Sequence, residues 1–91
     1  MKRNLARIHL KTIKRGGKEN RLIRITYELS SENPEKYRIT EPYEIREAKS
    51  GDLYYWGYDI AKEQIRQFRI LDIASARITA EHYQPRWDIK V

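Results

Sequence analysis

The sequence predicts a mainly β domain, either a small antiparallel barrel or a strongly bent sheet, preceded by a short N-terminal helix. Three observations support this prediction. Five short segments of alternating apolar and polar residues recur at intervals of about ten residues, separated by turn-forming residues, which is typical of small all-β folds. The first segment of the chain is instead rich in helix-forming residues. The length of 91 residues suits one domain with one modest core.

Two structures are compatible with the first 20 residues. Asn4 could cap a helix that carries Leu5, Ile8 and Thr12 on one face and that ends with Gly16 just beyond its last turn. Equally, the two adjacent glycines could form a tight turn that joins two strands of a hairpin. Because Ala, Leu, Lys and Arg dominate the segment, we favour the helix.

The division of the chain follows from this choice. Residues 1–20 form a basic N-terminal segment, and residues 21–91 form the β domain. The first strand is predicted over residues 22–29, where apolar and polar side chains alternate with the period of a half-buried strand. Pro34 then interrupts the pattern.

The middle of the chain predicts two short strands, at residues 36–40 and 43–47, bent around Pro42. A proline cannot donate a hydrogen bond to a central ladder, so we expect it at an edge or a corner of the sheet. A glycine-containing hairpin turn follows at residues 49–52.

Three further strands complete the predicted sheet. They span residues 53–59, 65–71 and 73–79. With the preceding elements they give the five-stranded antiparallel arrangement expected of a small barrel.

Charge is distributed unevenly along the chain. The protein has 19 basic and 13 acidic residues, a net charge of +6. The first 24 residues contain nine basic side chains and one acid, a net of +8, and the remainder has ten basic and twelve acidic residues, a net of −2. Such asymmetry is typical of nucleic-acid binding, because basic groups that neutralise phosphates release condensed counterions. The alternative is a solvated basic tail that increases solubility.

Several functional classes find no support in the sequence. The chain has no cysteine and no apolar run long enough to span a membrane, so we expect a cytoplasmic protein without a membrane partner. The two histidines, His9 and His82, lie far apart and match no metal-site or nucleophile spacing. We therefore predict no metal, no cofactor and no catalysis.

An aromatic run within residues 53–59 is the most distinctive feature of the chain. Alternation places Tyr54, Trp56 and Tyr58 on one face and Tyr55 on the other. The first face could be core, or it could leave one or two rings open as a platform for stacking. We expect at least Trp56 to be buried and leave the exposure of Tyr54 open.

The following strand carries two arginines beside apolar residues. Phe68 and Ile70 share the parity of the core, and Arg66 shares it too, whereas Arg69 points the other way. A guanidinium that leans inward must be paired, because an unpaired buried charge is costly. Arg66 could pair with a nearby acid such as Glu63, or it could bind a ligand.

The aromatic run resembles a motif of the WYL domain, a bacterial and archaeal module. Residues 51–59 resemble that family's Gly-x-Trp-Tyr-Leu-x-x-Tyr-Asp segment. Leu53 replaces the name-giving Trp, Tyr55 replaces the Leu, and Tyr54 is retained.

Three further motifs extend the resemblance from residue 22 to about residue 83. Residues 66–73 resemble the family's Arg-x-Phe-Arg-Leu-Asp-Arg-Ile motif without its Asp and second Arg. Residues 25–27 resemble its Ile-x-Tyr, and residues 38–42 its Arg-x-x-x-Pro.

The resemblance implies an Sm-like, SH3-type five-stranded barrel preceded by a helix, and binding of nucleic acid or of a nucleotide-like ligand. The family's ligand positions carry over to Tyr54, Arg66 and Arg69. Most members attach this domain to a helix-turn-helix, and this chain is similar to free-standing versions such as those that accompany CRISPR systems.

Together these observations predict a non-catalytic domain that binds single-stranded RNA or DNA as an accessory or regulatory factor. The candidate binding residues are Tyr54 and Tyr27 for stacking on bases, Arg66 and Arg69 for holding phosphates, and Arg24 and Arg38 for extending the electrostatic track. Two alternatives remain open: a sensor of a nucleotide or short oligonucleotide, and an adaptor whose basic segment docks an acidic partner such as an effector protein. A dimer is compatible with each function.

Overall fold

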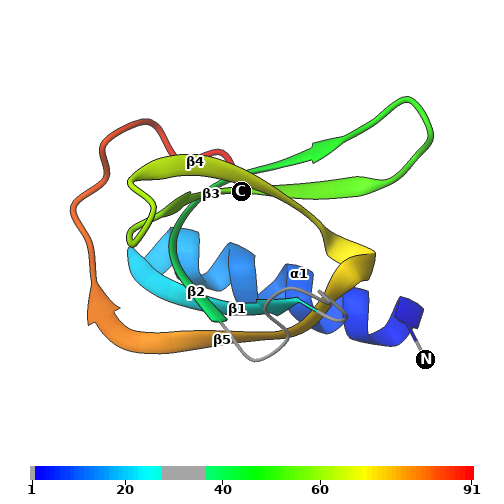
Figure 1. Ribbon diagram of the computed structural model, residues 1–91, viewed down its shortest axis with the longest axis horizontal. Coiled ribbons are helices and arrows are strands. Elements are labelled where there is room, and N and C mark those ends of the chain that lie inside the picture. The colour runs from blue at the N-terminus through cyan, green and yellow to red at the C-terminus, as the bar shows by residue number, and fades with distance from the viewer. Residues whose placement is uncertain (1, 28–36) are drawn as a thin grey trace.

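The computed structural model describes residues 2–27 and 37–91, whose arrangement is shown in Figure 1. The elements are α1 (Lys2–Glu19), β1 (Arg21–Tyr27), β2 (Tyr37–Glu47), β3 (Leu53–Asp59), β4 (Gln64–Arg69), the 3₁₀ turn η1 (Ile70–Asp72) and β5 (Ile73–His82). The predicted break at Pro34 lies outside the described residues, as do the predicted strand ends at residues 28–29 and 36.

The five strands form one antiparallel sheet in the order β4-β3-β2-β1-β5. The sheet is strongly curved, and Figure 1 shows η1 carrying the chain from β4 on one side to β5 on the other. These two strands are the edges of the sheet, and no ladder joins them within the described part of the chain. The predicted mainly β fold is thus confirmed as a five-stranded antiparallel sheet with an N-terminal helix, without closure into a barrel being shown.

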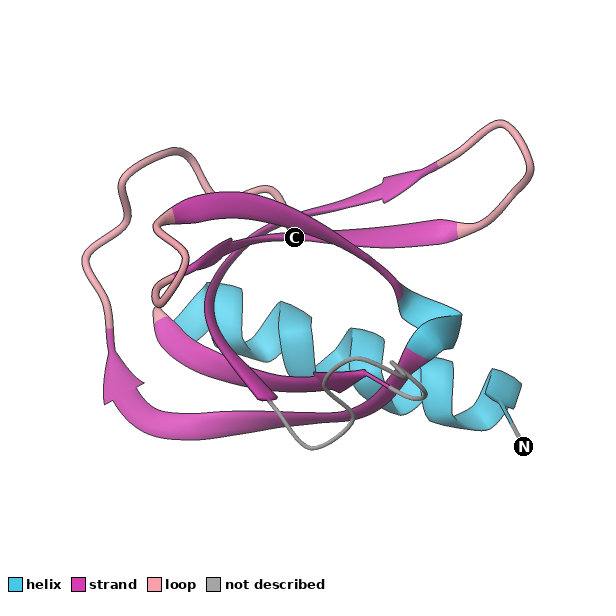
Figure 2. Cartoon of the chain, viewed as in Figure 1, coloured by secondary structure: helices cyan, strands magenta, loops and turns pink. Residues whose placement is uncertain are grey.

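The hairpin between β2 and β3 has the predicted turn. Gly51 adopts a φ of 92°, a conformation that favours glycine, and its N–H donates a hydrogen bond of 2.9 Å to the carbonyl oxygen of Ala48. The N–H of Ala48 in turn donates to the carbonyl oxygen of Asp52 at 2.8 Å. Figure 2 shows this hairpin extending beyond the rest of the sheet.

The N-terminal segment is a helix rather than a hairpin, but its face and its end differ from the prediction. Ala6, Leu10 and Ile13 pack on the core with helical spacing, whereas Leu5 and Ile8 are exposed. The prediction that Leu5 and Ile8 lie on the buried face of the helix is therefore wrong.

The helix also begins before Asn4 and continues through Gly16 to Glu19, so neither predicted cap is correct. Asn20 ends it instead, with a φ of 54°. The glycines allow close packing: a Cβ on Gly16 would lie 2.5 Å from the Cδ1 atom of Ile23, so its absence lets α1 approach β1 without displacing that side chain.

Pro42 lies inside a single continuous strand, so the predicted division into two strands is wrong. It is opposite Gly57 of β3, and the ladder with β1 ends at Thr40, so β2 is paired with a strand on only one side at Pro42, which agrees with the edge expected for a proline. The pairing shifts immediately afterwards, because Glu44 is opposite Trp56 and Tyr43 is the extra residue of a β-bulge. Bulges are one of the few places where a sheet accepts a proline, since the ladder is interrupted there.

The core lies between α1 and the concave side of the sheet. Its buried apolar residues are Ile13, Ile23, Ile25, Tyr55, Phe68, Ile70 and Ile73. β4 ends at Arg69, earlier than predicted, and η1 then turns Ile70 inward. Among the helices that the structure describes, none is long and apolar enough to cross a membrane.

Candidate functional site

Successive residues of β3 alternate between the two faces of the sheet, and the face toward the core is the opposite of the one predicted. The buried inner residues are Tyr55, Gly57 and Asp59, and the partly exposed outer residues are Tyr54, Trp56 and Tyr58. The expectation that Trp56 is buried in the core is therefore wrong.

The inner face of β3 is built around Tyr55. Its ring stacks on Phe68 with 5.7 Å between centroids, and its hydroxyl shares a hydrogen bond of 2.7 Å with the Thr40 hydroxyl. Gly57 leaves room for this ring, since a Cβ there would lie 2.6 Å from the Tyr55 oxygen. One large aromatic therefore fills the inner face, and the other three rings are left on the outer face.

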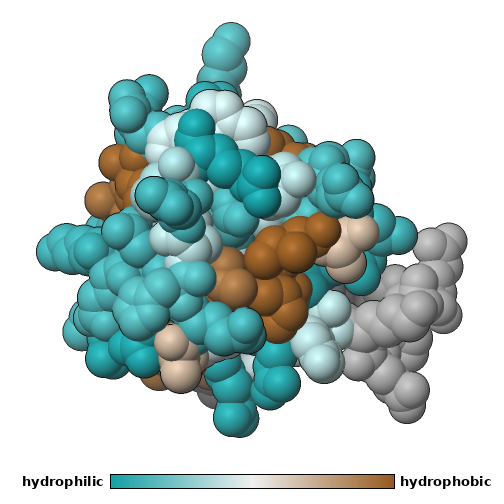
Figure 3. Space-filling view, turned by 90° about the vertical axis from the view of Figure 1, so that its left-hand side faces the viewer, coloured by the Kyte–Doolittle hydropathy of each residue, from teal (hydrophilic) through white to brown (hydrophobic). Residues whose placement is uncertain are grey.

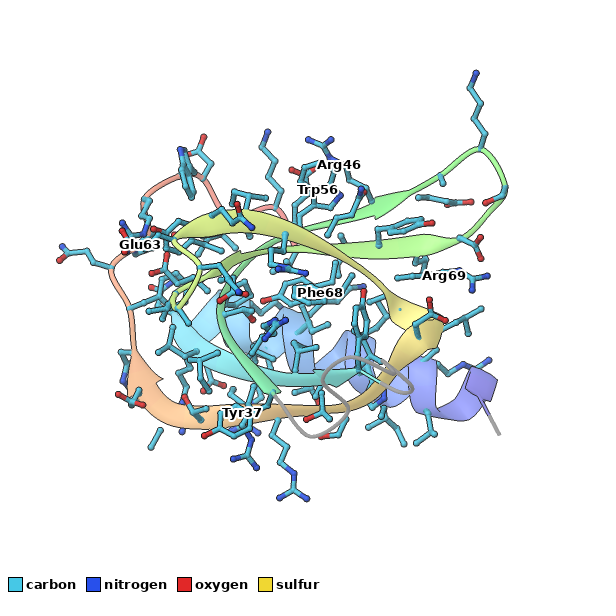
Figure 4. All side chains as sticks on the ribbon, in the orientation of Figure 1. Tyr37, Arg46, Trp56, Glu63, Phe68 and Arg69 are labelled. Atoms are coloured by element: carbon cyan, nitrogen blue, oxygen red, sulfur yellow. The ribbon has the colours of Figure 1, made fainter. Side chains whose placement is uncertain are left out.

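Tyr54 lies between two arginines on the outer face. Arg46 of β2 is opposite it on one side, and Arg69 of β4 is opposite it on the other. In Figure 4, Arg46 and Trp56 project from the outer side of the sheet, whereas Phe68 points into the interior. We call Arg46, Tyr54 and Arg69 the outer row.

Acidic side chains hold Arg69 in place. Its guanidinium donates hydrogen bonds of 3.1 Å to Asp52 and 3.4 Å to Asp72. The bond from Arg69, followed by one from Ser50, keeps the pKa of Asp52 below its ordinary value. An anion that binds Arg69 must therefore compete with Asp52.

Trp56 continues the aromatic stripe beyond the outer row. The guanidinium carbon of Arg46 is 4.3 Å from the centroid of its ring, within the range of a cation–π interaction. Arg46 also forms an ion pair with Glu44. A hollow of about 350 Å³ lies beside these rings, lined by Arg46, Glu47, Ala48, Tyr54, Trp56 and Gln67.

A second group of predicted residues meets on the inner face. Asp59 is fully buried, and its Oδ2 atom is 3.5 Å from Nε of Arg38 and 4.0 Å from Nε of Arg66. Arg66 therefore pairs with Asp59, and the suggested partner Glu63 does not appear among its ion pairs in the described chain. Two guanidiniums share one carboxylate, so this inner cluster has a net charge of +1. The sequence placed Arg66 on this face correctly.

The remaining predicted residues lie elsewhere. The ring of Tyr27 packs edge-on against Phe68 at 5.2 Å, and its hydroxyl accepts a hydrogen bond of 3.0 Å from the backbone N–H of Arg69. This ring is occupied with packing rather than open for stacking. Arg24 stacks over Tyr37 at 4.8 Å, and Figure 4 shows Tyr37 on the opposite side of the molecule from Arg46.

The six predicted residues thus fall into separate places. Tyr54 and Arg69 are neighbours in the outer row, Arg38 and Arg66 form the inner cluster, and Tyr27 and Arg24 belong to neither. Arg46 was not among the predicted residues, although the hairpin turn could have indicated it: pairing residues outward from that turn brings Arg46 opposite Tyr54.

The basic side chains of α1 are exposed and lie on the other layer of the molecule. Arg7, Lys11, Lys14 and Lys18 point to solvent, because the opposite side of the helix packs on the concave side of the sheet. They are therefore not part of the outer row. No group of three potential metal ligands occurs among the described residues.

A curved antiparallel sheet of five strands with a helix on its concave side defines a class of small, mainly β domain. The WYL domain profile matches residues 8–78. This chain belongs to the WYL domain family, as the sequence motifs indicated. Domains of this family generally serve in regulation and ligand binding rather than in catalysis.

A solved structure shows the same fold. Proteasome accessory factor B/C (PafBC) of Arthrobacter aurescens superposes with a TM-score of 0.74 and 18% sequence identity. The alignment covers 93% of this chain and 14% of that chain, so the domain corresponds to a small part of the larger protein. A comparison with curated protein sequences finds no significant match.

Proposed function

We propose that this domain binds a single strand of RNA or DNA through the outer face of β3, as a regulatory rather than a catalytic unit. The observation that carries the proposal is the outer row, in which a partly exposed tyrosine lies between arginines of the two neighbouring strands. An aromatic ring accepts a base of any sequence by stacking, and flanking guanidiniums attract the phosphates on both sides of that base.

The spacing of the aromatic stripe supports a strand rather than a single nucleotide. Tyr54 and Trp56 are two residues apart on the same face of β3, a separation of about 7 Å at the usual strand rise. Successive bases of an extended strand can therefore meet successive rings.

The acidic side chains of the outer face compete with phosphates for the arginines and so should lower the affinity for a strand. Arg46 is paired with Glu44 and Arg69 with Asp52 and Asp72. Exposed ion pairs of this kind are weak, typically about 0.2–1 kcal/mol, so phosphates can displace them. Binding should consequently weaken with salt, at a slope of about −0.7 per phosphate contact on a log–log plot.

Fluorescence anisotropy with a labelled single-stranded oligonucleotide tests the proposal. Tyr54→Ala should weaken binding about tenfold or more, since stacking contributes roughly 1–3 kcal/mol per base. Tyr37→Ala is the matched control, because Tyr37 is another exposed tyrosine beneath an arginine but lies far from the outer row. Equal affinity for a duplex, or equal losses in both variants, would contradict the proposal.

The inner cluster favours a second candidate function, the sensing of a nucleotide. Arg38 and Arg66 are partly exposed and share the single charge of Asp59, so they retain capacity for one phosphate group. In that case a mononucleotide should saturate the domain, and Arg66→Gln should weaken its binding more than Tyr54→Ala does. Isothermal calorimetry with mononucleotides distinguishes the two functions, because strand binding requires the reverse order.

A further inference from the structure

Hydrogen bonds hold the C-terminal segment, residues 83–91, against the outer side of β2. The Tyr83 hydroxyl donates a hydrogen bond of 2.7 Å to the carbonyl oxygen of Pro42. The backbone N–H of Arg86 donates to the Tyr43 hydroxyl at 2.9 Å, and that of Lys90 donates to the Tyr43 carbonyl oxygen at 2.6 Å. The segment is therefore held at three points along its length.

A buried carboxylate strengthens this attachment. Glu41 is almost completely buried; it accepts hydrogen bonds from the Tyr43 hydroxyl at 2.6 Å and from Nε of Arg86 at 3.0 Å. The Arg86 guanidinium also lies 4.2 Å above the ring centroid of Tyr58. Arg86, the residue directly before Trp87, is thus held by an ion pair, a hydrogen bond and a cation–π contact.

Trp87 packs against two tyrosines and is nevertheless exposed. Its ring meets Tyr43 edge-on at 5.1 Å and lies 5.9 Å from Tyr58, yet 52% of the residue remains accessible to solvent. A large aromatic that packs on neighbouring rings and is open on one side can serve as a stacking platform.

Trp87 and Trp56 face a common groove of about 590 Å³. Its lining residues are Tyr43, Glu44, Trp56, Ile65, Trp87, Asp88 and Lys90. These come from β2, β3, β4 and the C-terminal segment. Ile65 is exposed to solvent. Apolar residues also gather in the middle of the mostly hydrophilic face shown in Figure 3. The groove is large enough for one nucleobase with its sugar.

The charged groups of the groove favour a base over a phosphate, because its lining includes two carboxylates, Glu44 and Asp88, and one amine, Lys90. Glu44 is paired with Arg46, which leaves Asp88 as the carboxylate available to a ligand.

We propose that this groove is a base-specific subsite, which takes an amino-bearing base, such as cytosine, from the strand whose neighbouring base stacks on Tyr54. The inference rests on the proposed function. The exocyclic amino group of cytosine donates to a carboxylate such as that of Asp88, whereas thymine and uracil carry a carbonyl oxygen at that position, which a carboxylate repels. The groove would thus give the domain a preference for base composition that stacking alone does not provide.

The test compares labelled oligocytidylate and oligothymidylate strands of equal length. The wild-type protein should bind the cytosine strand about tenfold more tightly. Asp88→Asn should reduce this ratio toward one, and Trp87→Ala should weaken binding of the cytosine strand about tenfold, while Trp87→Phe retains most of it. Tyr54→Ala is the matched control, since it should weaken binding of both strands and leave their ratio unchanged.

The possible failures are distinguishable. If the wild-type protein binds neither strand, the proposed function falls and the subsite falls with it. If binding depends on Tyr54 but is unchanged by Trp87→Ala and Asp88→Asn, only the subsite is overturned. A change of oligomeric state in Trp87→Ala with unchanged strand affinity would also overturn it, because the groove would then be an interface between copies. The chain has two tryptophans, both in the groove, so quenching of intrinsic fluorescence by the strand gives a second readout.

Discussion

The two faces of β3 use the same kinds of side chain for different purposes. On the inner face, Tyr55 is completely buried, stacked on Phe68 and hydrogen-bonded to Thr40. On the outer face, Tyr54 and Trp56 are partly exposed and lie beside guanidiniums. An aromatic-rich strand need not be all core, since its two-residue period can bury one ring and leave the neighbouring rings at the surface, where we propose that they bind a ligand.

The largest expected difference is in stability. Tyr55→Ala removes a buried ring and should lower the free energy of unfolding by about 3–5 kcal/mol. Tyr54→Ala, one residue away on the outer face, should change it by less than about 1 kcal/mol. Urea unfolding followed by circular dichroism measures both, and similar losses in the two variants would contradict the assignment of the faces.

A smaller loss of stability is expected when a methyl group is added to the packed inner face. Gly57→Ala places a methyl group 2.6 Å from the Tyr55 oxygen and 3.2 Å from the Thr40 Cβ, within a packed region. Such overpacking typically costs about 1–3 kcal/mol. Thermal unfolding should show a lower midpoint in this variant, and an unchanged midpoint would mean that the Tyr55 ring moves easily.

The stability of the buried side of the domain should also depend on pH. His9 of α1 is buried against the core, and burial lowers its pKa below the ordinary value of 6.5. The unfolded chain therefore binds more protons, so stability is greatest above the unfolded pKa and declines as the pH falls below about 6.5. His9→Gln should flatten the dependence of unfolding free energy on pH between about 5 and 8. An equally steep dependence in the variant would show that other groups cause it.

The smallest expected change in stability comes from the outer face. Asp52→Asn keeps an oxygen that can accept a hydrogen bond from Arg69 but removes a solvent-exposed charge, so the unfolding free energy should stay close to that of the wild-type protein. Strand affinity should rise by up to about fivefold, because a phosphate no longer competes with a carboxylate for Arg69. Anisotropy measures the gain, and a loss of affinity would mean that Asp52 positions the arginine for binding.

Alternation of residue types predicted most of the sheet but could not decide which face of β3 is inside. It separated Tyr54, Trp56 and Tyr58 from Tyr55 correctly. The larger set looked more like core, because nothing local shows that Gly57 makes room for a neighbouring ring. That space depends on β2, which lies beside β3 only in the folded protein.

Pairing across long separations explains the other failures. Asp59 resembles a solvated strand end in sequence, yet it is buried because Arg38 and Arg66 approach it from two other strands. The turn residues and the family motifs predicted the β2–β3 hairpin and the position of Tyr54. The C-terminal segment carries no periodic pattern, so its place beside the groove could not be predicted.

The bulge at Tyr43 has a consequence for how this domain can evolve. Because Tyr43 is an extra residue, the strand pairing on both sides of it remains regular without it. The same residue provides two of the hydrogen bonds that hold the C-terminal segment. Deletion of this one residue would therefore remove both hydrogen bonds while the sheet persists, so the C-terminal side of the groove can change independently of the fold that supports it.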